Sequence, residues 1–159
     1  MNLGTTVIRK ISETGCQIRD AQLARAALPP LRRLSDLVQA MEEHRRLSAR
    51  LLAGDARDEL RRQQLAQSIG DIQSRTRPLA AEWERATTDW RLLRRAVDSR
   101  ALEPQQAEAW HDALLATYRD GLRTLEQLDG RLARRVDDLR REQCRNLGGS
   151  RAAAELPCG

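Results

Sequence analysis

The apolar residues of this chain recur every three or four positions over most of its length, which is the spacing of one face of an α-helix. Proline and glycine interrupt the pattern at a few points and divide it into segments. The first segment ends at Pro29 and Pro30, because proline lacks an amide hydrogen and disfavours helix in the residue before it. The pattern predicts helical segments over about 5–28, 30–53, 55–98 and 104–146, followed by a flexible tail over 147–159.

The second segment is bounded by residues that suit the two ends of a helix. Pro30 fits the first helical turn, where its missing donor is not needed. Gly54 can adopt the left-handed conformation that ends a helix, and Asp55 can cap the helix that follows. We therefore expect a tight turn between two helices at Gly54 and Asp55.

The third segment carries a seam of apolar positions whose steps alternate between three and four residues, as in helices packed with a 3.5-residue period. Pro78 lies inside this seam, and an interior proline kinks or breaks a helix at a cost of about 3 kcal/mol. Because the phase continues across Pro78, we expect a kinked helix. A chain reversal at this point is the alternative, and it would give a compact up-down four-helix bundle. The seam residues are Leu65, Ile69, Ile72, Thr76, Leu79, Trp83, Ala86, Trp90, Leu93 and Val97.

These segments predict an all-α fold, an antiparallel up-down bundle of long helices that forms a single domain over 1–146. The composition agrees, because Leu, Ala, Arg, Glu and Gln dominate and β-branched residues are sparse. With a kink at Pro78, the third and fourth segments are each roughly 65 Å long at 1.5 Å per residue. The first two segments placed end to end match that length, so three antiparallel rods are self-consistent.

The net charge of +5 comes almost entirely from arginine, since Lys10 is the only lysine. A basic chain can bind nucleic acid or an anionic surface, but a solvated helical surface explains the charge equally simply. We favour the solvated surface, because acidic residues interrupt the arginine cluster near the end of the fourth segment and aromatic residues are absent from it. That cluster contains Arg131, Arg134, Arg135, Arg140, Arg141 and Arg145, with Asp137, Asp138 and Glu142 between them.

Cysteine use and hydropathy indicate the expected compartment. The odd count of Cys16, Cys144 and Cys158, without a CxxC pair, predicts no disulfide framework and so a reducing environment. No run of 18 apolar residues is present, and residues 1–10 lack the apolar core of a secretory signal. We expect a cytoplasmic protein without a membrane span.

The second segment breaks its own apolar pattern at Arg45 and Ser48, and His44 lies beside them. A guanidinium that faces a bundle core is costly unless it is paired, and its planar fork suits a carboxylate or a planar oxyanion. One hypothesis is a small-anion site formed by Arg45, Ser48 and His44. The alternative is a salt bridge between Arg45 and an acid on a neighbouring helix, or an Arg45 that extends to the rim. The seam in heptads is Leu31, Leu34, Val38, Met41, Arg45, Ser48 and Leu52.

Other chemistry is sparse. We find no glycine-rich phosphate loop, nucleophile elbow or HExxH motif, and therefore expect no enzyme and no cofactor. His44 and His111 are too few and too far apart in the sequence to predict a metal site. Trp83 and Trp90 are seven residues apart on one seam, so both are expected in the core.

Several short runs resemble one family of bacterial receptors. Residues 43–48 (EHRRLS), followed by 51–55 (LLAGD), resemble the "HRGLS…L.G" helix of nitrate- and nitrite-sensing (NIT-type) helical domains. Residues 90–93 and 111–115 resemble the later helices of such sensors, so the resemblance covers roughly residues 30–128. It implies a helical sensor in which an arginine of the first motif binds a planar anion. By resemblance that role falls on Arg45.

Three functions follow from these observations. The first is a soluble, non-enzymatic helical bundle that senses a small anion such as nitrate or nitrite and signals through a protein partner. The second is a ligand-free interaction bundle, an adaptor or an export chaperone, because residues 51–55 also resemble the "LLxGD" turn of flagellar-type secretion chaperones. Nucleic-acid binding through the arginine-rich end is the third. Long continuous seams also allow a homodimer under each of them.

Overall fold

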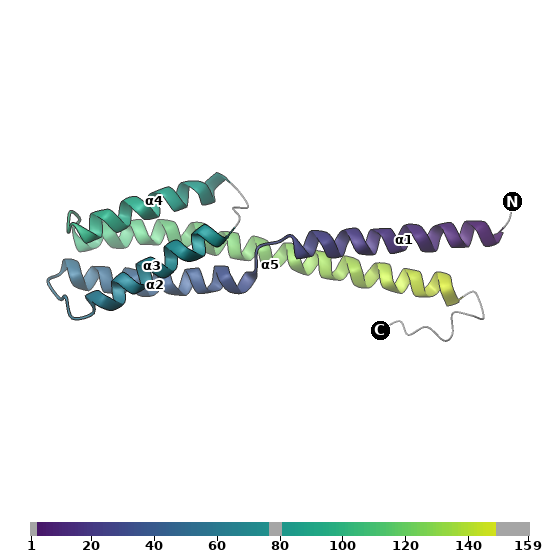
Figure 1. Ribbon diagram of the computed structural model, residues 1–159, viewed down its shortest axis with the longest axis horizontal. Helices are drawn as coiled ribbons and strands as arrows, with labels where there is room; N and C mark the ends of the chain where they lie inside the picture. Colours follow the sequence, from purple (N-terminus) through teal and green to yellow (C-terminus); the bar gives the residue numbers. More distant parts are fainter. Residues whose placement is uncertain (1–2, 77–80, 149–159) are drawn as a thin grey trace. The chain divides into compact units, whose positions relative to one another are not determined.

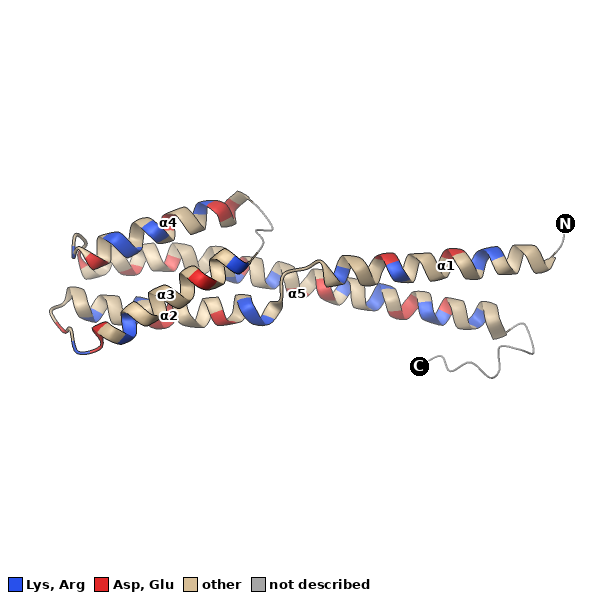
Figure 2. Cartoon of the chain, in the orientation of Figure 1, with Lys and Arg blue, Asp and Glu red and all other residues tan. Residues whose placement is uncertain are grey.

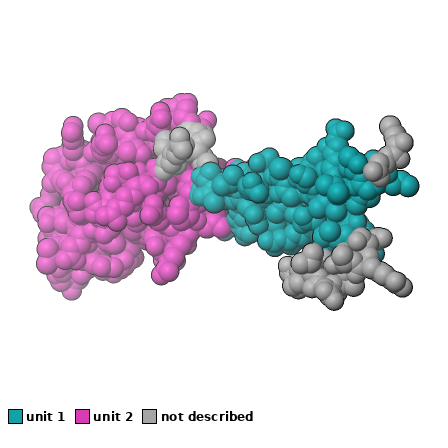
Figure 3. Space-filling view, turned by 45° about the vertical axis from the view of Figure 1, so that its right-hand side comes forward, with its two compact units in different colours: residues 1–28, 126–159 teal, residues 29–125 magenta. Residues whose placement is uncertain are grey.

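The computed structural model describes residues 3–76 and 81–148, which contain five α-helices and no strand. This confirms the all-α prediction. The chain divides into two compact units, of which unit 1 comprises residues 1–28 and 126–159 and unit 2 comprises residues 29–125 (Figure 3). The sequence pattern predicted one bundle over 1–146 and gave no sign of this division. The helices are α1 (Leu3–Ala26), α2 (Leu31–Leu52), α3 (Glu59–Arg75), α4 (Ala81–Asp98) and α5 (Pro104–Gly148), labelled in Figure 1.

The chain reverses between α3 and α4. Nη2 of Arg62, in the first turn of α3, lies 2.7 Å from Oδ1 of Asp98, the last residue of α4. In one continuous helix these two residues, 36 apart, would be separated by roughly 54 Å. The expected kinked helix over 55–98, and with it the three-rod arrangement, is therefore wrong, and the alternative reversal is correct. Pro78 itself lies outside the described residues.

Unit 2 is a four-helix bundle built from α2, α3, α4 and residues 104–125 of α5 (Figure 1). Each helix turns one apolar stripe inward, and Trp83 and Trp90 are buried as the seam predicted. Side chains of the bundle that are no more than 1% exposed include Leu34, Leu37, Met41, Ala66, Ile69, Trp90, Leu93, Val97, Ala107, Leu115 and Leu125.

The turn between α2 and α3 partly follows the expected chemistry. Gly54 has a φ of 98°, the left-handed conformation predicted for a residue that ends a helix. Asp55 does not cap α3, which begins only at Glu59. Its Oδ1 instead accepts a hydrogen bond from the backbone N–H of Arg57 at 3.1 Å, which stabilises the loop before α3.

Gly121 of α5 lets the helix approach the indole of Trp83. A Cβ placed on Gly121 would lie 2.3 Å from Cζ2 of Trp83, a distance that no side chain tolerates. The Trp83 ring in turn lies 6.0 Å from the ring of Tyr118, measured between centroids. The position of this tryptophan therefore depends on the missing side chain at residue 121.

Unit 1 pairs α1 with residues 126–148 of α5 in antiparallel directions. Nε of Arg25 donates to Oδ1 of Asp129 at 2.6 Å near one end of the pair, and Gly15 faces Gln143 further along. A pair of helices shares only one face, so much of the apolar surface of α1 stays open to solvent. Leu3, Ile8 and Leu23 are 83%, 69% and 62% exposed.

Two expectations about the environment of the chain can be compared with the structure. Cys16 is a free, exposed thiol, whereas Cys144 is disulfide-bonded, although the odd cysteine count predicted no disulfide framework. Cys158 lies outside the described residues. None of the helices in the described ranges is long and apolar enough to cross a membrane. The cytoplasmic location stays a prediction.

Replacing Gly121 with alanine should destabilise unit 2. The added methyl group overlaps the Trp83 indole, and overpacking of this kind costs about 1–3 kcal/mol of unfolding free energy. Gly70 in α3 is the matched control, since nothing lies within 4 Å of its added Cβ. Gly70→Ala should stabilise the protein by about 0.5–1 kcal/mol through helix propensity. Urea unfolding measures both changes, and similar stabilisation by the two substitutions would contradict the close contact.

Candidate functional site

A buried polar cluster joins the four helices of unit 2. His44 and Ser48 of α2, Arg62 of α3 and His111 of α5 are each at most 1% exposed. The indole of Trp90 from α4 packs edge-on against the His44 ring, with centroids 4.8 Å apart. Buried polar groups are stable only when they are hydrogen-bonded, so the partners of these side chains decide what the cluster does.

The hydrogen bonds of the cluster form one directed chain. Nδ1 of His111 lies 2.6 Å from the carbonyl oxygen of Ala107, which can only accept, so this nitrogen carries the proton. In a neutral ring Nε2 of His111 then accepts from Nδ1 of His44, at 2.9 Å. Nε2 of His44 is left to accept from Nη1 of Arg62 at 3.3 Å. Both tautomers are thus fixed by the neighbours, and the chain runs from α3 through α2 to α5.

Arg62 is balanced by two carboxylates. Its guanidinium donates to Oε1 and Oε2 of Glu59 at 2.5 and 2.7 Å, and to Oδ1 of Asp98 at 2.7 Å. The side chain of Arg62 is 1% exposed, whereas those of Glu59 and Asp98 are 28% and 47% exposed. The acids therefore stay in contact with water and neutralise the buried cation, and the guanidinium has no free edge for a further oxyanion.

Both histidines are neutral in the folded protein. Burial, together with the neighbouring His111 and Arg62, lowers the pKa of His44 to about 2. Burial also lowers the pKa of His111 to about 4, although its hydrogen bond to Ala107 acts in the opposite direction. Protonating either ring would place a second positive charge beside Arg62 and break the chain of hydrogen bonds.

The structure corrects the orientation of Arg45. The buried stripe of α2 runs through Leu34, Met41 and Ser48. On one side of this stripe His44 is also buried, together with Leu37 and Leu51. Arg45 lies on the other flank with a side chain 39% exposed, and its Nε is 2.9 Å from Oδ1 of Asp112 on α5. This Nε–H is not aligned for a hydrogen bond. The expectation that Arg45 faces the core is wrong, and the alternative of a salt bridge at the rim describes its position.

The three residues of the predicted anion site therefore do not lie together in the structure. His44 and Ser48 lie together in the core, with Ser48 Oγ 3.2 Å from Nδ1 of His44, while Arg45 points to the rim. Because Nδ1 of His44 carries the proton, it is not free to act as a base for the hydroxyl of Ser48. His44 and Ser48 also line neither of the two cavities of unit 2 that are described below. No group of three metal-ligating side chains gathers within residues 3–76 and 81–148.

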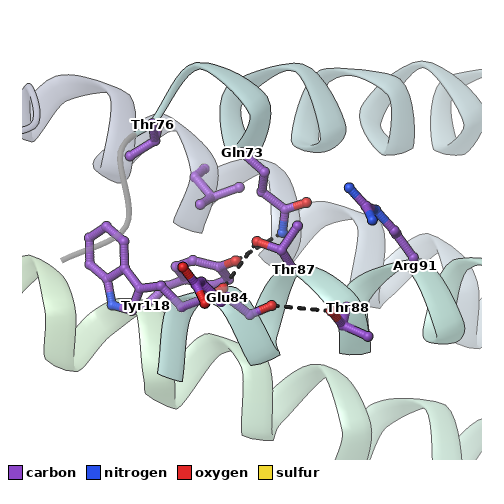
Figure 4. Close-up of a pocket in the computed structure, with 9 residues that line it drawn as sticks. Gln73, Thr76, Glu84, Thr87, Thr88, Arg91 and Tyr118 are labelled. Atoms are coloured by element: carbon purple, nitrogen blue, oxygen red, sulfur yellow. Dashed lines mark hydrogen bonds between the residues drawn. The ribbon is translucent and has the colours of Figure 1, made fainter. Parts of the chain in front are cut away.

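A cavity of about 290 Å³ lies about two turns along α2 from the cluster, beside Tyr118 (Figure 4). We call it the Tyr118 pocket. Its apolar wall consists of Leu37 from α2 and the rings of Trp83 and Tyr118. Its polar lining comes from Gln73 of α3 and from one face of α4. A second cavity of about 260 Å³, between α4 and α5, is lined by Trp110 and by the charged side chains Glu82, Arg85 and Asp89.

The uncharged polar groups of the Tyr118 pocket already have hydrogen-bond partners. Nε2 of Gln73 donates to the hydroxyl of Tyr118 at 2.9 Å, and Thr87 also bonds this hydroxyl. Thr87 Oγ1 donates to the carbonyl oxygen of Trp83 at 3.0 Å. Burial raises the pKa of Tyr118, so the phenol stays neutral at physiological pH. These bonds fix the wall of the pocket and tie α5 to α3 and α4.

Two charged groups of the Tyr118 pocket remain unpaired. Glu84 and Arg91 line it from α4, and neither side chain makes an ion pair or a side-chain hydrogen bond within the described part of the chain. Several other charged residues of unit 2 pair across neighbouring helices, as Arg61 does with Glu43 and Arg119 does with Glu42. Figure 2 shows the two signs of charge interspersed along the helices.

Sequence reasoning missed this pocket for a physical reason. Thr76 and Trp83 lie on the predicted apolar seam of the third segment, and no pattern in the sequence singles out Gln73, Glu84 or Tyr118. The one available signal was the reversal at Pro78, which would have placed the end of α3 beside the start of α4. Gln73 and Tyr118 are 45 residues apart, and only the folded bundle brings them together.

Comparison with protein-family models, with curated proteins and with solved structures gives no significant match for this chain. The resemblance to nitrate- and nitrite-sensing domains therefore stays a prediction, and the function has to be argued from the residues of unit 2.

The two buried histidines should make the stability of the protein fall in mild acid. Their pKa values of about 2 and about 4 in the folded state lie below the unfolded value of about 6.5. The unfolded chain thus binds more protons below pH 6.5, and the unfolding free energy should fall by roughly 1 kcal/mol per pH unit for each histidine from there toward pH 4. Urea unfolding at a series of pH values measures this slope.

A double variant separates the histidines from other acid effects. His44→Gln/His111→Gln does not titrate at these two positions, so it should be less stable at neutral pH and lose most of the slope between pH 6.5 and 4. A slope unchanged in this variant would assign the acid sensitivity to other groups.

Proposed function

We propose that unit 2 is a non-enzymatic ligand-binding module of a sensing or signalling protein, and that its ligand occupies the Tyr118 pocket. The observation that carries the proposal is a half-open, partly apolar cavity whose lining includes the exposed guanidinium of Arg91, which makes no ion pair within the described residues. Ligand sites in helical bundles are commonly built between facing helices from an apolar wall and a few polar groups.

The position of the pocket suits signalling. Leu37 belongs to α2, Gln73 to α3, Arg91 to α4 and Tyr118 to α5, so a ligand there would contact every helix of the bundle. A ligand shifts a conformational equilibrium only by its difference in affinity for two states. Contacts with four helices at once make such a difference achievable through small changes in helix packing.

The guanidinium of Arg91 favours an anionic group on the ligand. Arg91 has no carboxylate partner in the described part of the chain, whereas Arg45 is paired with Asp112 and Arg62 with Glu59 and Asp98. A planar fork with free donors is suited to a carboxylate or to an oxyanion such as nitrate. The anion role that the resemblance gave to Arg45 is therefore proposed for Arg91.

Thermal unfolding tests this proposal. We would compare sodium nitrate, sodium caproate and ε-aminocaproate with sodium chloride at equal ionic strength. A ligand at 100 times its dissociation constant adds about 2.7 kcal/mol, which raises the unfolding temperature by several degrees. At least one of the three should do so, and the rise should disappear in Arg91→Gln.

Arg45→Gln is the matched control, because it removes the same group from the same bundle outside the pocket. It should retain the ligand-induced rise and cost about 0–1 kcal/mol, as expected for an exposed ion pair. Equal unfolding temperatures in all solutions, or a rise that Arg45→Gln abolishes and Arg91→Gln retains, would contradict the proposed site.

A second candidate function is self-association through unit 1, and the exposed apolar side chains of α1 favour it. Leu3, Ile8 and Leu23 are the most exposed large apolar residues of unit 1, on a helix that packs against a single neighbour. The same helix pair from a second copy could cover this surface and complete a four-helix arrangement with two-fold symmetry.

Sedimentation velocity distinguishes a dimer from a monomer. The unchanged protein should sediment as a dimer, and Ile8→Glu/Leu23→Glu should shift it to a monomer, because two charges would be buried at the contact. Leu92→Glu is the control, since Leu92 is exposed on α4 of unit 2 and should leave the dimer intact. A monomer at all concentrations of the unchanged protein would exclude this function.

A further inference from the structure

We propose that the ligand of the Tyr118 pocket is a small zwitterion, an aliphatic or aromatic amino acid-like molecule whose cationic group binds Glu84 and whose carboxylate binds Arg91. This inference rests on the proposed function and names the class of ligand that the same pocket would take. No sequence motif indicated it, and it follows from three features of the lining.

The first feature is a pair of opposite charges at a fixed separation. Glu84, Thr88 and Arg91 follow one another at intervals of four and three residues, so they share one face of α4. The rise of the helix places Glu84 and Arg91 about 10 Å apart along its axis. Figure 4 shows Glu84 near Tyr118 and Arg91 toward the opposite end of the lining.

The second feature is that the groups between the two charges are already bonded. Thr88 Oγ1 donates to the carbonyl oxygen of Glu84, and Gln73, Thr87 and Tyr118 are joined by their own hydrogen bonds. A ligand that bound these groups would have to replace existing bonds. Glu84 and Arg91 have none to replace within the described residues, so they should dominate the polar recognition.

The third feature is the apolar wall. Leu37, Trp83 and the ring of Tyr118 form the apolar part of the lining. The volume of about 290 Å³ is at the lower end for ligand sites, which favours a small molecule. A short methylene chain or a single ring between the two charged ends would cover this wall, because apolar surface gains from leaving water.

A ligand with one charge matches this lining less well. An anion alone would bind Arg91 but leave the carboxylate of Glu84 without a partner in the same pocket. A cation alone would bind Glu84 and leave the guanidinium of Arg91 without a partner. A zwitterion satisfies both groups without changing the net charge of the site. Electrostatic complementarity of this kind supplies specificity between ligands of equal size.

Isothermal titration calorimetry on the full chain tests the inference with three probes of matched length. These are ε-aminocaproate, caproate, which lacks the amine, and hexylamine, which lacks the carboxylate. We expect ε-aminocaproate to bind at least tenfold more tightly than either. Glu84→Gln should reduce its affinity to that of caproate, and Arg91→Gln should reduce it to that of hexylamine.

Exchanging the two charges provides the sharpest variant. In Glu84→Arg/Arg91→Glu the same two charges are present in the reverse order, and a flexible ω-amino acid can bind in the reverse direction. Affinity for ε-aminocaproate should therefore return to within a few-fold of the unchanged protein. Glu82→Gln and Arg85→Gln remove single charges from the same helix but line the other cavity, so they should change the affinity by less than twofold.

The outcomes separate the inference from the proposed function. If caproate binds as tightly as ε-aminocaproate and Glu84→Gln has no effect, the inference is overturned while the anion site at Arg91 stands. If none of the probes binds, both are overturned. A double exchange that binds no better than the single variants, with its helical content and unfolding temperature unchanged, would also overturn the inference.

Discussion

The hydrogen-bonded chain from Arg62 through His44 to His111 is the interaction on which unit 2 depends, because each of its groups is buried and each satisfies the next. The chain ends on the carbonyl oxygen of Ala107, and Asp98 anchors its other end to α4. A purely apolar core would allow the four helices to slide past one another. These hydrogen bonds hold the helices in one register, because only that register provides each group with its partner.

The same constraint explains the contrast between the two parts of the bundle. Around His44 the two imidazole rings and the guanidinium of Arg62 are hydrogen-bonded in sequence, and the buried charge of Arg62 is neutralised by carboxylates at the surface. About two turns away, the wall of the Tyr118 pocket is fixed by internal hydrogen bonds, but the charges of Glu84 and Arg91 are not used. A rigid bundle beside unpaired charges is a suitable frame for ligand binding, since the site is organised before the ligand arrives.

Much of the candidate site follows from local pattern, and some of it does not. The seam of the third segment placed Trp83 in the core, and the seam of α2 placed Ser48 there. The heptad pattern placed Arg45 on the seam and His44 beside it, whereas the structure buries His44 and leaves Arg45 partly exposed. Desolvation decides between them, since a neutral imidazole with two partners is cheaper to bury than a guanidinium.

The sequence by itself determined which stretches of the chain are helical, most of the residues that these helices bury, and the left-handed turn at Gly54, because helical period and backbone sterics act within a few residues. Only the tertiary structure decided that α4 returns along α3, since periodicity records which side chains are buried and carries no information about the direction of the axis. The hydrogen bonds of Arg62 with Asp98 and of Gln73 with Tyr118 also depend on the tertiary structure. Their members are far apart in the chain, and the packing of four helices alone brings them within hydrogen-bonding distance.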